Sequence, residues 1–120
     1  MDRYFLVLIL FVGLNNLIAD DHIPVSYGME GYQCNFESGK NMDDVTDFIS
    51  KDLNPYADKS WKAAYSGFVL TPFLRSASET NFDFGWVGFT NSHKDMGIVQ
   101  DSWFSEEAAS TFAKWDSISD

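Results

Sequence analysis

The sequence predicts an α+β fold in which a small sheet carries its helices on one face. Three segments contain stretches that favour strands, and two others repeat apolar residues at helical spacing. Their order along the chain is strand, helix, strand, strand, helix. A parallel crossover followed by a hairpin makes up most of the split β-α-β plan, so we expect a ferredoxin-like topology.

The first predicted strand covers residues 30–37. Tyr32, Cys34 and Phe36 share one face of it, whereas the residues between them are polar. A period of two is typical of a strand with one buried side. Gly39 and Lys40 then predict a turn.

The first helix follows directly. Asn41 is a good N-cap, and Asp43 and Asp44 lie in the first turn, where carboxylates complement the helix dipole. Because the residue before a proline avoids helical geometry, Pro55 predicts an end at or before Asn54. The apolar stripe of this helix consists of Met42, Val45, Phe48, Ile49 and Leu53.

The second and third strands are predicted at residues 65–73 and 82–89. The first is rich in aromatic and branched side chains, and Pro72 places its end near a sheet edge or bulge. In the second, Phe82, Phe84 and Trp86 alternate with smaller or polar residues. The polar loop between the two strands is short enough for a hairpin.

The last part of the chain predicts two helical segments. Ser92 and Asp95 resemble a capping box, and Met96, Val99 and Trp103 follow at helical spacing. A second helix start is predicted at Ser105. The residues that support this final short helix are Glu106, Glu107, Ala108, Ala109, Phe112 and Trp115.

The ferredoxin-like plan requires a fourth strand, which residues 115–120 are too short to supply. Either the chain is truncated, or an N-terminal segment or a partner subunit fills the gap. Because an unpaired sheet edge invites association, we expect a homo-oligomer formed through the sheet or a longer native chain.

Residues 1–19 have the pattern of a secretory signal peptide. Arg3 precedes a short apolar run, and the small Ala19 stands at the expected cleavage point. The run is shorter than the ~20 residues of a comfortable membrane span, so we expect no stable span. An uncleaved N-terminal anchor and a buried helix are the alternatives. We therefore expect an exported protein, periplasmic or extracellular, with a flexible lead-in at residues 20–29 and a single domain at residues 30–120.

The charge balance restricts the partners. The 120 residues include 18 acidic and 8 basic side chains, a net charge of −10. Removal of residues 1–19 takes away one of each, so the charge is unchanged. Nucleic acids and anionic lipids require a cationic surface and are not expected to bind.

Several stretches resemble a family of uncharacterised exported bacterial proteins, over about residues 31–112. The family is similar in plan to the dimeric α+β barrel, and it runs on past the point where this chain stops. It has no settled activity to carry over. The matching stretches are Cys34–Phe36 with Gly39 and Lys40, Met42–Val45, Leu70–Phe73 and Asp83–Gly88.

The resemblance implies one enzymatic alternative, a small periplasmic enzyme that acts on an apolar or haem-like ligand. Some dimeric α+β barrel enzymes degrade haem with an asparagine on the first strand, a core tryptophan and a histidine on a later helix. By residue type alone, Asn35, Trp86 and His93 would be the counterparts. A tryptophan on an alternating strand is nevertheless usually a core residue.

A metal site is conceivable at the new N-terminus. Cleavage after Ala19 would leave a chain that begins with Asp20, Asp21 and His22. The amine, two deprotonated backbone amides and the imidazole would then offer four nitrogens in a plane, a set that favours Cu(II) or Ni(II). A histidine at this place by chance is the alternative.

Other reactive side chains have structural explanations. Cys34, the only cysteine, is read as a small buried hydrophobe, or as a disulfide partner for a segment outside this chain. The carboxylate pairs Asp43/Asp44 and Glu106/Glu107 lie in predicted first turns, and neighbours on a helix do not face each other.

The aromatic content is the remaining clue, since 17% of the residues are aromatic. Many lie in the predicted hairpin, so both faces of the sheet are expected to be covered. Core packing, a second subunit and a small apolar ligand are the three explanations. The sequence therefore favours a non-enzymatic domain that acts by binding or self-association.

Overall fold

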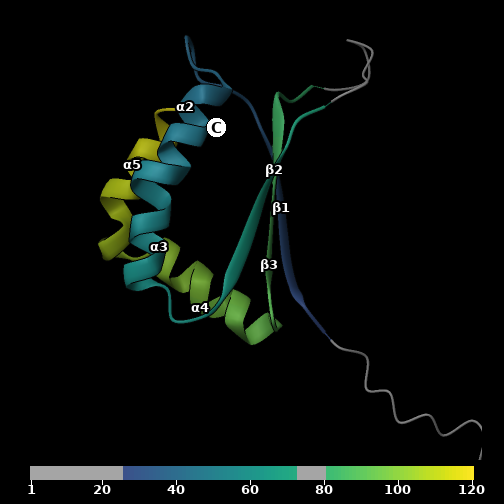
Figure 1. The fold of residues 1–120 in the computed structure, drawn as a ribbon, viewed down its shortest axis with the longest axis vertical. Helices are drawn as coiled ribbons and strands as arrows, with labels where there is room; N and C mark the ends of the chain where they lie inside the picture. Colours follow the sequence, from purple (N-terminus) through teal and green to yellow (C-terminus); the bar gives the residue numbers. More distant parts are fainter. Residues whose placement is uncertain (1–25, 73–80) are drawn as a thin grey trace, which may run out of the picture.

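The computed structural model describes residues 26–72 and 81–120, and within them it contains one three-stranded sheet (Figure 1). The strands are β1 (Gly28–Cys34), β2 (Tyr65–Leu70) and β3 (Phe84–Thr90). The sheet order is β1-β3-β2, and β3 is antiparallel to both neighbours. The predicted hairpin between the second and third strands is therefore confirmed.

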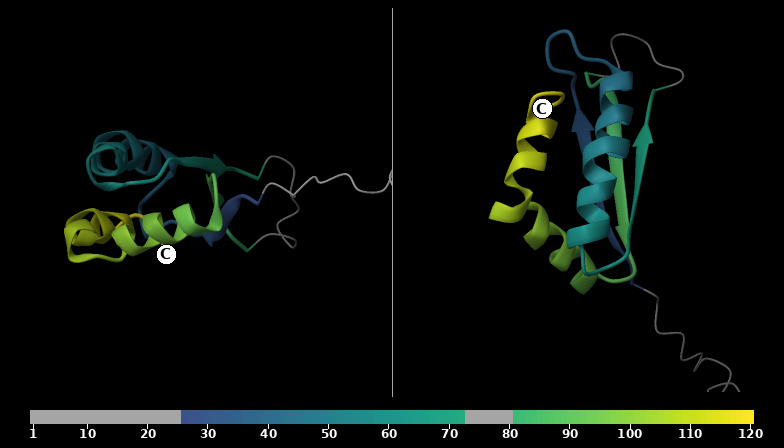
Figure 2. Two further views of the ribbon diagram at one scale, coloured as in Figure 1. Left: turned by 90° about the horizontal axis from the view of Figure 1, so that it is seen from below. Right: turned by 60° about the vertical axis from the view of Figure 1, so that its left-hand side comes forward.

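The helices form a second layer on one face of this sheet (Figures 1 and 2). The result is a mixed α+β structure with the predicted order of elements. One helical stretch joins β1 to β2, and another follows β3. The first consists of α2 (Met42–Phe48), the π-helical η1 (Ile49–Leu53) and α3 (Asn54–Ser60); the second consists of α4 (His93–Trp103), the 3₁₀ turn η2 (Glu106–Ala108) and α5 (Ala109–Asp116).

The strand limits differ slightly from the prediction. β1 begins at Gly28, so the end of the expected lead-in belongs to the sheet, and β3 begins only at Phe84. β2 ends at Leu70, two residues before Pro72. Phe73 and most of the predicted loop lie outside the described residues, as does the proposed signal peptide. No helix in the described ranges is long and apolar enough to cross a membrane.

The start of α2 follows the sequence closely. Asn41 has an extended backbone, and its Oδ1 accepts a hydrogen bond from the Asp43 N–H at 2.8 Å. Asp44 Oδ2 accepts from the Asn41 N–H at 2.9 Å, which completes a capping box. Val45 and Phe48 are buried on the predicted apolar stripe. Asp43 and Asp44 are thus explained by the helix start.

The predicted helix end at Pro55 is wrong. The chain continues through η1 into α3, and Pro55 lies in the first turn of α3. Proline is tolerated in a first turn because no intrahelical partner is needed for its missing N–H. The wider π-turn before it changes the hydrogen-bond spacing from i−4 to i−5. The helix therefore passes the proline and reaches Ser60.

The C-terminal helices begin where the sequence indicates. Ser92 Oγ accepts a hydrogen bond from the Asp95 N–H at 3.1 Å at the start of α4. Met96 and Val99 are buried, as their spacing predicts. Ser105 precedes η2, which leads directly into α5.

The chain ends beside β1. Phe36 and Ser119 form an antiparallel bridge, and Asn35 and Asp120 exchange two backbone hydrogen bonds of 3.2 and 3.1 Å. The Glu37 N–H also donates to the Ile118 carbonyl at 2.8 Å. Residues 118–120 thus extend the sheet on its β1 side but form only an isolated bridge.

The core lies between α2, η1, one end of the sheet and the C-terminal tail, residues 118–120. Val45 and Phe84 have no exposed surface, and Phe48 and Cys34 are almost completely buried beside them. Leu53 and Ile118 complete this cluster. Cys34 is a free, buried thiol in this chain, which agrees with its interpretation as a small hydrophobe.

Candidate functional site

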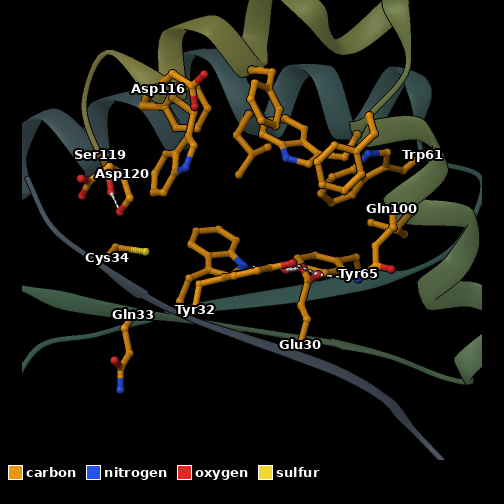
Figure 3. A pocket seen from close by; sticks show the side chains of 18 residues that line it. Glu30, Tyr32, Gln33, Cys34, Trp61, Tyr65, Gln100, Asp116, Ser119 and Asp120 are labelled. Carbon is orange, nitrogen blue, oxygen red and sulfur yellow. Dashed lines mark hydrogen bonds between the residues drawn. The ribbon is translucent and has the colours of Figure 1, made fainter. Parts of the chain in front are cut away.

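A cavity of about 280 Å³ lies between the sheet and the helices, next to the core (Figure 3). Drug-sized ligands usually occupy pockets of roughly 300–1,000 Å³, so this cavity suits a small molecule. Its lining is strongly aromatic. All four tryptophans of the chain contribute to it: Trp61, Trp86, Trp103 and Trp115.

The sheet forms the floor of the cavity. Side chains opposite each other in antiparallel strands point to the same face. Cys34 is opposite Phe84, Tyr32 is opposite Trp86, and Glu30 is opposite Gly88. Because β1 alternates, Glu30, Tyr32 and Cys34 all point toward the helices, whereas Gln33 points away from them (Figure 3).

The helices cover the side of the cavity opposite the sheet. Three polar contacts join the two helical arms, which are the stretch α2–η1–α3 and the stretch α4–η2–α5. Tyr56 Oη donates to the Ser102 carbonyl at 2.9 Å, which joins α3 to α4. Ser60 Oγ donates to Glu107 Oε1 at 2.7 Å, which joins α3 to η2. An ion pair between Lys114 and Asp52 joins α5 to η1. The helical elements that line the cavity are therefore joined to one another.

Aromatic contacts continue through this helical side of the cavity. Trp115 lies 5.4 Å from Phe48 and 6.2 Å from Trp86 between ring centroids. Trp103 lies 5.3 Å from Phe112. Tilted and edge-on pairs at such distances are the favoured aromatic geometries. The rings thus hold one another in position around the cavity.

A polar network centred on Glu30 occupies the floor. Glu30 Oε1 accepts a hydrogen bond from Tyr65 Oη at 2.7 Å. Glu30 Oε2 accepts from Tyr32 Oη and from Gln100 Nε2, both at 3.1 Å. Trp86 Nε1 donates to Tyr65 Oη at 2.6 Å. Residues from β1, β2 and α4 therefore converge on one carboxylate, and Trp86 on β3 joins the network through Tyr65.

Two glycines make this convergence possible. Tyr65 extends across β3 to reach Glu30 on β1, and a Cβ on Gly88 would overlap the Tyr65 hydroxyl. A Cβ on Gly67 would lie 2.6 Å from the Trp86 ring. Glycine inside a strand often marks such a close approach.

The network keeps its tyrosines protonated. Burial, followed by the hydrogen bond to Glu30, holds the pKa of Tyr65 well above its ordinary value of 10.0. Partial burial and the charge of Glu30 also raise the pKa of Tyr32. Both hydroxyls are therefore hydrogen-bond donors at neutral pH.

One polar atom of the lining is unpaired. Trp61 Nε1 is buried and has no hydrogen-bond partner among the described residues, although its ring lies 4.8 Å from that of Tyr65. A buried N–H without an acceptor costs free energy, on the order of 1–3 kcal/mol.

The opposite end of the cavity lies at the tail. Cys34, Asp116, Ser119 and Asp120 line it there (Figure 3). Burial raises the pKa of the Cys34 thiol. A neutral thiol is a poor nucleophile, so this side chain is not set up for covalent catalysis.

The structure does not bring the three haem-type candidates together. Trp86 lies in the centre of β3 and lines the cavity. Asn35 follows β1 at one end of the sheet, whereas His93 begins α4 beyond the other end of β3. Neither Asn35 nor His93 is part of the lining, and both are exposed.

The metal hypothesis concerns residues that the structure does not describe. Asp20, Asp21 and His22 lie outside the described ranges. Within residues 26–72 and 81–120, no group of three or more potential ligand side chains could hold a metal ion. Glu107, from the second carboxylate pair, is bonded to Ser60.

Local sequence patterns do not identify Glu30, Tyr65 and Gln100 as parts of one site. A signal for Glu30 was present, because it has the same parity as Tyr32 and Cys34 and so falls on the apolar face of β1. An acidic residue on a buried strand face requires partners. The pairing of β1 with β3, which supplies those partners, could not be read from local patterns.

Comparison with known proteins gives no match: no family model, no curated protein and no solved structure matches the chain.

Proposed function

We propose that this domain is a binding protein whose ligand is a small, largely apolar molecule held in the aromatic cavity. The observation that carries this proposal is the cavity of about 280 Å³ lined by all four tryptophans. A largely apolar pocket with a few placed polar groups is the usual form of a small-molecule site. The three contacts between the helical arms support a site that exists before the ligand arrives.

Binding is favoured over catalysis by the state of the polar groups. The hydroxyls of Tyr32 and Tyr65 donate to Glu30, and both tyrosine pKa values are raised. A general base needs a pKa near the working pH, which these groups do not have. The enzyme alternative also relied on Asn35 and His93, which lie outside the lining.

A neutral fluorescent probe tests this proposal. N-phenyl-1-naphthylamine gains fluorescence in apolar sites, so titration into the protein should give a saturable increase. Trp103→Ala should weaken the probe at least about fivefold, because it removes one wall. Phe68→Ser is the matched control, since Phe68 lies on the other face of the sheet and should leave the affinity unchanged. No saturable signal with wild-type protein would reject the proposal.

A second candidate function is self-association through the open face of the sheet. The register places nine residues on that face, and none of them is charged. Phe68 is 53% exposed, and its ring meets that of Phe89 at 6.0 Å. The nine residues are Met29, Gly31, Gln33, Ser66, Phe68, Leu70, Gly85, Val87 and Phe89.

A second copy of the chain is the occupant that fits this face. The protein carries a net charge of −10, so two copies repel each other at most surfaces. An uncharged apolar face avoids this repulsion and can pair with itself around a twofold axis. Such a pairing would place the two sheets face to face, as in a dimeric α+β barrel.

Native mass spectrometry and sedimentation test this candidate. We expect a dimer for the wild-type chain and a monomer for Phe68→Ser. Phe104→Ser is the control, because Phe104 is even more exposed, at 69%, but lies on the helical side. A wild-type monomer at high concentration, or a Phe68→Ser dimer, would reject it.

The finer topology and the location of the protein are also proposals. We propose a ferredoxin-like arrangement, supported by β1 and β2 lying on either side of an antiparallel β3. Residues 118–120 pair with residues 35–37, directly beyond the end of β1 and on the side where that plan has its fourth strand. We also propose export, as in the exported family that the sequence resembles. The intact mass of the secreted product tests export and the cleavage site together.

A further inference from the structure

We propose that the cavity selects an organic cation of the quaternary ammonium type. This inference rests on the proposed function, because it names the ligand class of the same cavity. Three independent properties of the lining support it: its charge, its aromatic faces and the state of its hydrogen-bonding groups.

The charge of the lining is entirely negative. Glu30 lies on the floor, and Asp116 and Asp120 lie at the tail end (Figure 3). No lysine, arginine or histidine is among the described residues that line the cavity. The donors to Glu30 are neutral hydroxyl and amide groups, so they satisfy its oxygens without neutralising its charge. An anion would be repelled, whereas a cation would be attracted.

The aromatic faces favour the same sign of charge. Four indole rings and the two phenol rings of Tyr32 and Tyr65 line the cavity. The face of an aromatic ring is negative, and tryptophan attracts cations most strongly. Aromatic enclosures of this kind are how proteins hold ligands with methylated ammonium groups.

The hydrogen bonds distinguish between types of ammonium group. Tyr32, Tyr65, Gln100 and Trp86 already donate within the Glu30 network. Three donors already occupy three of the roughly four lone-pair positions of Glu30, so a primary ammonium finds only one acceptor position on this carboxylate unless it displaces a donor. A quaternary ammonium has no N–H donors, so it interacts with the charge and the rings and leaves the network intact.

A pair of isosteric probes provides the test. Choline and 3,3-dimethylbutan-1-ol have the same shape, and they differ in a positive nitrogen at the position of a neutral carbon. Isothermal titration calorimetry should show that choline binds at least about tenfold more tightly to the wild-type protein. Equal or weaker binding of choline would overturn the inference.

The Glu30→Gln variant locates the source of this preference. It retains the size of the side chain and removes its charge, so the preference for choline should fall to about threefold or less. Glu37→Gln removes the same charge from an exposed position outside the cavity and should keep the wild-type ratio. If both variants keep the ratio, the Glu30 assignment is overturned.

N-phenyl-1-naphthylamine separates the two levels of the proposal. If this neutral probe binds but choline is not preferred, the cavity is a binding site and only the cation inference fails. If neither probe binds the wild-type protein, the proposed function itself fails. Retained binding of the neutral probe by Glu30→Gln also shows that the variant has folded with its cavity in place.

Discussion

Tyr65 on β2 donates a 2.7 Å hydrogen bond to Glu30 on β1, and this bond passes over the strand between them. The bond joins the two outer strands of the sheet through side chains, in addition to the backbone pairing of each with β3. It also positions the Trp86 indole, whose N–H donates to the same tyrosine oxygen. The floor of the cavity thus depends on a contact between residues that are far apart in sequence.

Replacement of Gly88 should disrupt this contact. In Gly88→Ala the new methyl group would overlap the Tyr65 hydroxyl, so the tyrosine must move away from Glu30. We expect a loss of about 1–3 kcal/mol in the free energy of unfolding, measured by urea denaturation. Gly31→Ala is the control, because the nearest atom to its Cβ is a backbone oxygen at 3.8 Å. Equal losses in both variants would contradict the prediction.

The same bond predicts a pH dependence. The folded pKa of Tyr65 lies above the unfolded value near 10.0, so the folded state keeps its proton when the unfolded state loses it. This contribution to stability is full below about pH 10 and decreases as the pH rises further. Thermal unfolding between about pH 9 and pH 11 should therefore show a steeper fall in Tm for wild type than for Tyr65→Phe. Parallel curves would disagree with the raised pKa.

The N-cap of α2 makes a separate prediction. Asn41→Ala removes the acceptor of the Asp43 N–H and should lower the free energy of unfolding by about 1 kcal/mol. Asn91 is exposed and precedes the cap of α4. Asn91→Ala should therefore change stability by no more than about 0.5 kcal/mol. Denaturant titrations of both variants provide the comparison.

The thiol of Cys34 should react slowly in the folded protein. Its side chain is 4% exposed, and burial raises its pKa, so little reactive thiolate is present. Ile118→Ala should speed modification by a disulfide reagent about tenfold, because Ile118 packs in the same cluster and anchors the tail. Ile98→Ala on α4 is the control. The idea that the tail protects the thiol fails if both variants react equally fast.

Local patterns predicted the elements well. The cap at Asn41, the alternation of Tyr32 and Cys34 and the start at Ser92 depend on residues close in sequence, and the structure has all three. Pro55 misled because the rule assumes regular α-helical geometry before it, whereas a π-turn precedes it here. No simple residue pattern predicts that a π-helical turn will precede the proline and allow the helix to continue.

The candidate site was much harder to predict. Its polar centre needs the register of β1 on β3, two glycines that leave space for rings, and a helix that brings Gln100 over Glu30. Each of these depends on long-range pairing. Sequence periodicity favoured a core role for Trp86 and left a ligand pocket as an alternative for the aromatic residues, since a ring that lines a cavity and one that fills a core follow the same pattern.

The position of β1 in the sheet has a consequence for the order of folding. Gly28 pairs with Thr90, whereas β2 pairs with β3 across a short connection. A contact between residues that are distant in sequence costs more loop-closure entropy than a local contact, so it forms later. We therefore expect the β2–β3 hairpin to form first and β1 to join it afterwards. The cavity needs both β1, which carries Glu30 and Tyr32, and the helices after β3, which are synthesised last. A chain still emerging from synthesis would therefore have no complete cavity, and ligand binding would report only on the finished fold.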